Sequence, residues 1–213
     1  MKIQSLLLAS TLIIMSGCKN KETNRNTEPE TKKPPISVIF ETDMGNDVDD
    51  ALALDMLYKY IESGKVNLLM TGTNKVSEYS AGYLDIMNTW YGHNIPIGTV
   101  TDGSNIDNAD NFVRATWLLE KDGVPVFERT VKKHADFPKA VPLYRKILAA
   151  QPDHSVYIIS VGFFTNLAQL LDAHADEYSP LTGKELVAQK VKLLSTMMGH
   201  FTDPEFAEFN VMC

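Results

Sequence analysis

The sequence predicts an α/β fold with an open, mostly parallel, doubly wound sheet. Short β-branched runs of strand length alternate along the chain with longer segments whose apolar residues recur at helical spacing. Strands that are separated by helices pair in parallel, because the helix carries the chain back to the end of the sheet where the first strand began. We therefore expect one domain over residues 36–213, long enough to bury a sizeable core.

The first half of this domain shows the alternation most simply. The helix expected after the first strand has Leu54, Leu57, Tyr58 and Ile61 on one face, and Gly64 ends it. In chain order we expect a strand at 36–40, a helix at 51–61, a strand at 66–71, a helix at 77–91, a strand at 95–100 and a polar loop at 102–110.

The second half contains the clearest single strand, a buried-type run at 156–161 that turns at Gly162 into a helix. In chain order we expect helices at 111–119 and 141–150, a strand at 156–161, helices at 165–173 and 185–190, and a strand at 191–198. The chain has no internal repeat.

The N-terminus has the order of a bacterial lipoprotein signal peptide. A lysine precedes an apolar stretch that is too short for a comfortable membrane span, and small residues follow it. Cys18, directly after Met-Ser-Gly, resembles the lipobox residue that is lipidated. This resemblance implies a signal peptide over residues 1–17 and a protein of the bacterial cell envelope, in the periplasm or at the outer membrane, that touches the membrane only through its lipid anchor. The alternative is an ordinary signal peptide in which Cys18 is incidental.

Composition limits the partners of the chain. Residues 18–35 contain no large apolar side chain, which predicts a disordered tether. The net charge is −7, and the only basic clusters are the pairs Lys32-Lys33 and Lys132-Lys133, so nucleic acid is not an expected partner. Apart from Cys18 the chain contains only Cys213, so no disulfide framework is available unless Cys18 stays unmodified.

An acidic cluster follows the first predicted strand, in the stretch ETDMGNDVDDALAL. Its carboxylates belong to Glu41, Asp43, Asp47, Asp49 and Asp50. A strand, a turn and a helix start would bring them to the carboxyl edge of the sheet, where open α/β folds bind ligands. Oxygen-only groups suit Ca²⁺ or Mg²⁺ better than zinc. Helix capping is the simpler interpretation of Asp49 and Asp50, but it does not account for the two acids before the turn.

Other polar residues follow the other predicted strands. Asn74 comes after the second strand, Thr165 and Asn166 after the strand at 156–161, and Glu208 and Asn210 after the last strand. Each alone is a weak signal: Asn74 is typical of a turn, Thr165 and Asn166 of a helix start, and Glu208 and Asn210 of a loop. Because parallel strands end at one edge, we expect them to face the acidic cluster, where amides and carboxylates could bind the hydroxyls of a sugar.

Three blocks of sequence resemble the inosine-uridine preferring nucleoside hydrolase family. The acidic stretch from Glu41 is similar to the family's aspartate signature, GFFTNL from Gly162 to its G-x-x-T-N motif, and MMGHFTDPEFAEFNV from Met197 to its later M-G-G and E-F-N segment. They occur in the family's order and span most of the domain. The resemblance implies the nucleoside hydrolase type of doubly wound sheet, and an enzyme that cleaves ribonucleosides to free base and ribose in nucleoside catabolism and salvage.

The resemblance also implies the roles of individual residues. Asp43 and Asp50 would ligate Ca²⁺ through their side chains, and Thr165 through its backbone carbonyl. Asp43 would also be the general base that takes a proton from the attacking water. The residues implied to hold ribose hydroxyls are Asp49, Asn74, Glu208 and Asn210. The partner would be a small nucleoside, and a homo-oligomer is compatible with the sequence.

The chain departs from the family pattern at several positions. Glu41 replaces the usual Asp, Met44 a common Pro, and His200 the second Gly of M-G-G, while Asn46 and Asp47 lengthen the acidic loop. Relatives also continue beyond the E-F-N segment, through a region that supplies another Asp ligand and, in many members, a His that protonates the leaving base. We therefore expect the chain to be a C-terminally incomplete hydrolase whose own activity is open.

Three other classes of protein are alternatives to a nucleoside hydrolase. A phosphatase of the haloacid dehalogenase type would need its nucleophilic Asp where Glu41 stands. An EF-hand would need a Gly and a terminal Glu at fixed offsets from the first Asp, and neither is present. A surface lipoprotein that binds nucleosides or sugars without cleaving them stays open as the alternative to a hydrolase.

Overall fold

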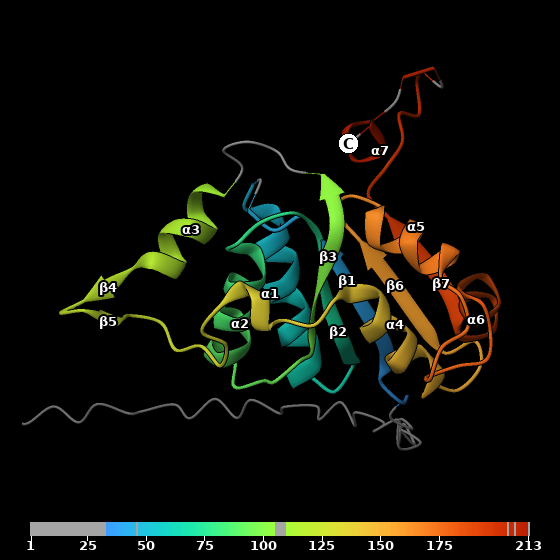
Figure 1. Ribbon diagram of the computed structural model, residues 1–213, viewed down its shortest axis with the longest axis horizontal. Helices are drawn as coiled ribbons and strands as arrows, with labels where there is room; N and C mark the ends of the chain where they lie inside the picture. The colour runs from blue at the N-terminus through green and yellow to red at the C-terminus, as the bar shows by residue number, and fades with distance from the viewer. Residues whose placement is uncertain (1–32, 46, 105–109, 204, 207, 213) are drawn as a thin grey trace, which may run out of the picture. The chain divides into compact units, whose positions relative to one another are not determined.

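The computed structural model describes residues 33–45, 47–104, 110–203, 205–206 and 208–212. Its main element is a five-stranded sheet with the order β3-β2-β1-β6-β7, in which all neighbouring strands are parallel (Figure 1). The strands are β1 (Ile36–Thr42), β2 (Val66–Lys75), β3 (Ile97–Ser104), β6 (Val156–Ser160) and β7 (Val191–Thr196). The predicted doubly wound α/β fold is thus confirmed.

The helices between these strands also follow the predicted order. They are α1 (Asp49–Glu62), α2 (Ser80–Trp90), α3 (Asn111–Leu118), α4 (Ala140–Ala149), α5 (Thr165–Asp172) and α6 (Gly183–Lys190). The sequence did not predict a hairpin of β4 (Glu120–Lys121) and β5 (Val124–Pro125), a 3₁₀ turn η1 (His134–Asp136), or the four-residue helix α7 (Phe209–Met212). These elements are short, so they carry too little periodicity to be recognised.

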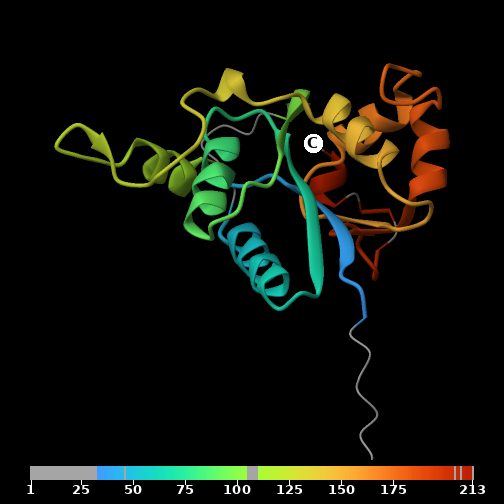
Figure 2. The ribbon, with the colours of Figure 1, turned by 90° about the horizontal axis from the view of Figure 1, so that it is seen from below.

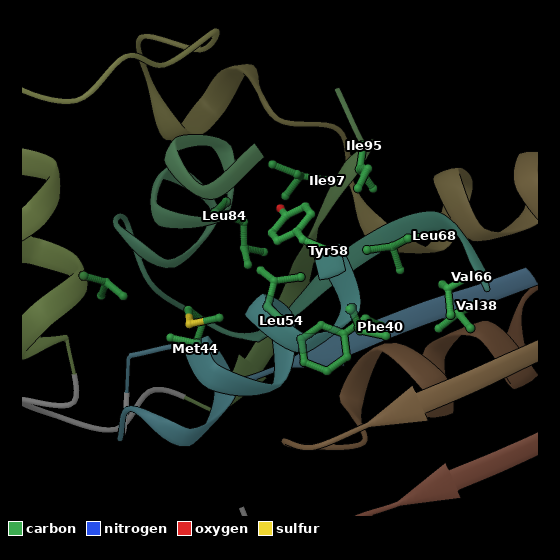
Figure 3. Packing of buried hydrophobic residues seen from close by; sticks show 14 of the residues in the cluster. Val38, Phe40, Met44, Leu54, Tyr58, Val66, Leu68, Leu84, Ile95 and Ile97 are labelled. Atoms are coloured by element: carbon green, nitrogen blue, oxygen red, sulfur yellow. The ribbon is translucent and has the colours of Figure 1, made fainter. Parts of the chain in front are cut away.

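The core has two layers, one on each face of the sheet. Val38 and Phe40 of β1 point to the face covered by α1 and α2, where they pack against Leu54 (Figures 2 and 3). Ile39 points to the opposite face, which α4, α5 and α6 cover, and packs in the second cluster with Tyr144. Because side chains alternate along a strand, Glu41 faces the same layer of helices as Ile39.

The order of the strands creates a topological switch point at β1. From β1 the chain winds through β2 to β3 on one side, and later through β6 to β7 on the other. The turn after β1 therefore lies beside the turn after β6, and Glu41 pairs with both Gly72 of β2 and Ser160 of β6. Ligands of open α/β sheets bind in the crevice at such a point.

The β2 strand is longer than predicted. Its last residues include Asn74, which was expected in the turn after the strand. The extension follows from pairing with β3, where Thr73 lies opposite Thr99 and Lys75 opposite Ser104, with an irregularity between the two pairs. Residues that read as turn formers are held in the strand by hydrogen bonds to a neighbour far along the chain.

The predicted signal peptide, lipidation site and most of the tether lie outside the described residues. This holds for residues 1–17, for Cys18 and for residues 19–32. Residues 33–35, which lead into β1, are exposed and irregular. Within the described part of the chain, no helix has both the length and the apolar character needed to cross a membrane.

Candidate active site

Two buried carboxyl groups meet where β1 ends and α1 begins. Asp43 follows β1 and is 5% exposed, and Asp50 in the first turn of α1 is 2% exposed. Burial, and then the negative charge of Asp43, raise the pKa of Asp50 to about 8. Burial also raises the pKa of Asp43, although the hydrogen bond with Asp50 partly offsets this rise. The two carboxyls thus share a site in which both cannot easily be ionised together.

The chemistry of this acid pair fits a hard cation. The donors are oxygens, and Oδ2 of Asp50 is buried without a hydrogen-bond partner. A bound cation would stabilise both carboxylates in the ionised form. Among the described residues, however, no three His, Cys, Asp or Glu side chains converge on one point, so the acids form a pair rather than a larger cluster.

Two other acids of the stretch from Glu41 are exposed rather than buried. Asp47 and Asp49 are exposed, in the turn and at the first position of α1. A hydrogen bond with Asp49, together with burial and neighbouring charge, raises the pKa of Asp47 to about 6. Val48 at the N-cap of α1 makes no side-chain hydrogen bond to the helix, so the exposed Asp49 can stabilise this end only through its charge.

Glu41, two residues before Asp43, is fully buried. Its side chain lies on the α4 and α5 side of the sheet, where Asn166 Nδ2 donates to its Oε2 at 2.9 Å and Tyr144 is a neighbour. Burial raises the pKa of Glu41 to about 7, although the hydrogen bond from Asn166 and the nearby polar groups of Tyr144 and Asn74 lower it. The longer side chain at this departure from the family pattern therefore reaches into the core.

Two asparagines connect the end of β2 to the start of α5. Asn166 Nδ2 donates to the carbonyl of Thr73 at 3.0 Å, and the amide of Phe163 donates to Asn74 Oδ1 at 3.1 Å. Both asparagine side chains are fully buried, and Asn74 Nδ2 has no hydrogen-bond partner. Thr165, half-buried beside Asn166, is thereby held close to β2.

Gly162 lets the turn after β6 approach the acid pair closely. A Cβ atom at this position would lie 2.5 Å from the amide nitrogen of Asp43, 2.6 Å from its Oδ1 and 2.7 Å from Asn74 Oδ1. No real side chain tolerates such distances, so the contact requires glycine. Gly162 therefore brings the predicted residues Asp43 and Asn74 together with the G-x-x-T-N motif.

The segment after β7 returns to the same turn. Asn210 of α7 is 4% exposed and donates from Nδ2 to the carbonyl of Met197 at 3.0 Å, while its own amide donates to Glu208 Oε2 at 3.1 Å. The ring of Phe209 lies 5.9 Å from that of Phe163 in the turn after β6. Figure 1 shows α7 beyond the arrowheads of the strands, at the edge that carries the acid pair.

The contacts of His200 are with residues of its own segment. The amide of Asp203 donates to His200 Nδ1 at 3.0 Å, and the exposed imidazole lies 4.9 Å from the ring of Phe206. These contacts shape the segment between β7 and α7.

Sequence reasoning missed one charged residue of the site, Lys75. It is 2% exposed at the end of β2, and its Nζ lies 3.0 Å from Oδ1 of Asp110, which also accepts a hydrogen bond from Ser77 at 2.9 Å. The positive charge of Lys75 acts on Asp43 by lowering its pKa. The only signal in the sequence is its place directly after Asn74.

These features define a class of protein: an α/β protein with a buried carboxylate pair at its topological switch point, where ligands of open α/β sheets bind. A comparison with known protein families identifies the family within this class. The family described as inosine-uridine preferring nucleoside hydrolase matches residues 38–213, and the chain belongs to this family. The predicted family membership is confirmed. No curated protein sequence matches the chain significantly.

Solved structures share the fold. The type III effector protein XopQ, solved in complex with adenosine diphosphate ribose, has a TM-score of 0.57 and 15% identity over 78% of this chain and 43% of its own. The effector protein XOO4466 has the same TM-score and identity over 78% and 44%. The plant nucleoside hydrolase PpNRh1 has a TM-score of 0.54 and 19% identity over 83% and 53%. The chain thus spans about half the length of these structures, and at these identities the likeness concerns the fold.

Proposed function

We propose that this domain hydrolyses the N-glycosidic bond of a ribonucleoside or a related ribose derivative. The observation that carries the proposal is the buried pair of Asp43 and Asp50 at the switch point of a nucleoside hydrolase family member. The complex of XopQ with adenosine diphosphate ribose supports a ribose-containing ligand for this fold.

The proposed cofactor is Ca²⁺. Asp43 and Asp50 would hold it through their side chains, and Thr165 through its backbone carbonyl. The oxygen-only donors and the buried, unpartnered Oδ2 of Asp50 support this choice. When bound, Ca²⁺ would orient the reacting water and the ribose hydroxyls and make that water more acidic.

Asp43 is the proposed general base. Water adds to the anomeric carbon of the ribose, the electron pair of the C–N bond leaves with the base, and a carboxylate oxygen of Asp43 takes the proton of the water. The nearby positive charge of Lys75 supports this role, because it favours the ionised form of Asp43 that accepts a proton. Positive charge develops on the ribose ring in the transition state as the C–N bond breaks, and the surrounding carboxylates would stabilise this charge.

The proposed ribose contacts come from three strand ends. Asn74 has an unpartnered Nδ2, which supports a role as donor to a hydroxyl. Asp49 is exposed at the start of α1, next to Asp50. Glu208 and Asn210 belong to a segment that contacts the turn after β6 through aromatic rings, which supports their place beside the same ligand.

The proposed location is the bacterial cell envelope, through lipidation of Cys18. The order of basic, apolar and small residues before Cys18 supports it. Intact mass measured on protein from a bacterial host should show loss of residues 1–17 and gain of a lipid, and Cys18→Ser should abolish the gain. An unlipidated wild-type chain would contradict the proposal.

Turnover measured with and without calcium tests the proposed reaction. The full chain is assayed with inosine, uridine and p-nitrophenyl riboside in Ca²⁺ and in a chelator, with Asp43→Asn as the test variant and exposed Asp172→Asn as the matched control. We expect calcium-dependent release of base or nitrophenol, a loss on the order of 10²–10⁴-fold for Asp43→Asn, and no loss for Asp172→Asn. Nucleoside binding without turnover would instead favour a non-catalytic binding protein.

A further inference from the structure

A buried acid precedes the proposed metal ligand Asp43 by two residues. Glu41 is the second-last residue of the central strand β1 and is completely buried. It lies opposite Gly72 of β2 on one side and Ser160 of β6 on the other, so it is enclosed between two neighbouring strands. It faces the layer of helices that Ile39 also faces, whereas the acid pair lies between the strand end and α1.

The contacts of Glu41 lead to the first turn of α5. Its Oε2 accepts a hydrogen bond from Asn166 Nδ2 at 2.9 Å, and the same nitrogen donates to Thr73 in β2 at 3.0 Å. The one amide group therefore joins three elements, β1, β2 and α5. Asn74, two residues after Gly72, makes the reciprocal link to Phe163 in the turn before α5.

We propose that Glu41 is a positioning residue, whose buried carboxyl fixes Asn166 and thereby holds the first turn of α5, with Thr165, against the end of β2 that carries Asn74. The expected effect of Glu41 on ligand binding rests on the proposed function, in which Thr165 contacts the metal and Asn74 contacts the ribose. Glu41 itself touches neither.

Space filling alone does not account for an acid at this position. A fully buried carboxyl group is costly unless hydrogen bonds compensate, and an apolar side chain of similar volume would fill the same space. Without an acceptor at residue 41, one of the two bonds of Asn166 Nδ2 is lost, and only the carbonyl of Thr73 remains. The turn from Phe163 to Asn166 would then be held less firmly.

The test compares three variants of the full chain. Glu41→Gln keeps the shape and the acceptor for Asn166, Glu41→Leu removes the acceptor, and Thr71→Val is the matched control, since Thr71 is equally buried in β2 and makes no side-chain hydrogen bond. The readouts are hydrogen exchange of the peptide covering residues 162–168, the dissociation constant of Ca²⁺ measured by calorimetry, and kcat and KM with p-nitrophenyl riboside.

Glu41→Leu should raise the exchange rate of residues 162–168 at least about tenfold and weaken Ca²⁺ binding by a similar factor. Glu41→Gln and Thr71→Val should stay within about threefold of the wild type in both. If Glu41→Leu does not fold, Asn166→Ala, which removes the other partner, should give the same pattern. Wild-type exchange and Ca²⁺ affinity in a folded Glu41→Leu or Asn166→Ala protein would overturn the inference.

Failure of the proposed function gives a different result. If the wild-type chain neither binds Ca²⁺ nor cleaves a riboside, the proposed function fails, but the exchange measurement still decides whether Glu41 holds the turn. Faster exchange in Glu41→Leu, together with normal exchange in Glu41→Gln, would support positioning without any measurement of activity. Equal exchange in both variants would overturn it.

Discussion

The carboxyl of Glu41 occupies the space that a side chain at residue 72 would fill. The two residues are register partners in β1 and β2, and a Cβ atom on Gly72 would lie 1.9 Å from Oε1 of Glu41. An acid longer than the Asp that is usual in the family is thus accommodated because its neighbour has no side chain. The two positions form one structural unit.

Gly72→Ala should therefore destabilise the protein through Glu41. The added methyl group forces the carboxyl out of its place, and we expect a loss of roughly 1–3 kcal/mol in the free energy of unfolding. Glu41→Asp withdraws the carboxyl by one methylene, so the double variant should recover most of the loss. Urea unfolding of the two single variants and the double variant gives the coupling energy. Additive losses would show that the two residues are independent.

Asp50→Asn should stabilise the protein in the absence of calcium. In the unfolded chain Asp50 ionises freely, but burial and Asp43 raise its pKa to about 8 in the fold, so at pH 7 folding must take up a proton. An Asn avoids this cost, and we expect a gain of roughly 1–3 kcal/mol in a chelator, with a smaller stabilisation on adding Ca²⁺. Thermal unfolding with and without Ca²⁺ measures both. A lower midpoint for Asp50→Asn in the chelator would contradict the electrostatic account.

Asp176 should make the protein sensitive to acid. Arg145 is 2% exposed, and its Nε lies 2.6 Å from Asp176 Oδ2, which holds the pKa of that carboxyl below its usual range. A lowered carboxyl pKa contributes stability above the ordinary value of about 3.9, and this stability is lost as the pH falls through the folded value.

Urea midpoints at pH 7 and below about pH 3.9 test this expectation. Asp176→Asn should lower the midpoint at pH 7 and reduce the further loss in acid, whereas the exposed control Asp172→Asn should do neither. An equal acid loss in Asp176→Asn and the wild type would show that other carboxyls are responsible.

Thr182 should stabilise the start of α6. Its hydroxyl oxygen accepts a hydrogen bond from the amide of Glu185 at 3.4 Å, and Glu185 Oε2 accepts one from the amide of Thr182 at 2.8 Å. Thr182→Ala should cost about 1 kcal/mol in the free energy of unfolding, and Thr182→Ser should cost little, because serine caps a helix as well as threonine. Urea unfolding distinguishes the two. An equal loss in both variants would point to the lost methyl group.

The strands and the long helices could be predicted because local periodicity encodes them. The run at 156–161 appears as β6 (Val156–Ser160), and the helix at 51–61 as α1 with a longer N-terminus. The hairpin of β4 and β5 could not be predicted, since strands of two residues have no period. The extension of β2 through Asn74 depends on pairing with β3, which no local pattern contains.

Some residues of the candidate site could be predicted from the sequence, and others could not. The spacing of the acids predicts that they gather where β1 ends and α1 begins, and Asp43 and Asp50 are buried there. The burial of Lys75 beside Asp110 joins residues far apart in the chain, and the sequence carries no sign of it.

The sequence by itself determined the order of strands and helices, the family and the presence of acids at a strand end, because these follow from local composition and spacing. Only the tertiary structure decided that the side chain of Glu41 lies in the core, where it meets Gly72 and Asn166. The physical reason is that side chains alternate across a strand, while their partners come from strands and helices brought near by folding.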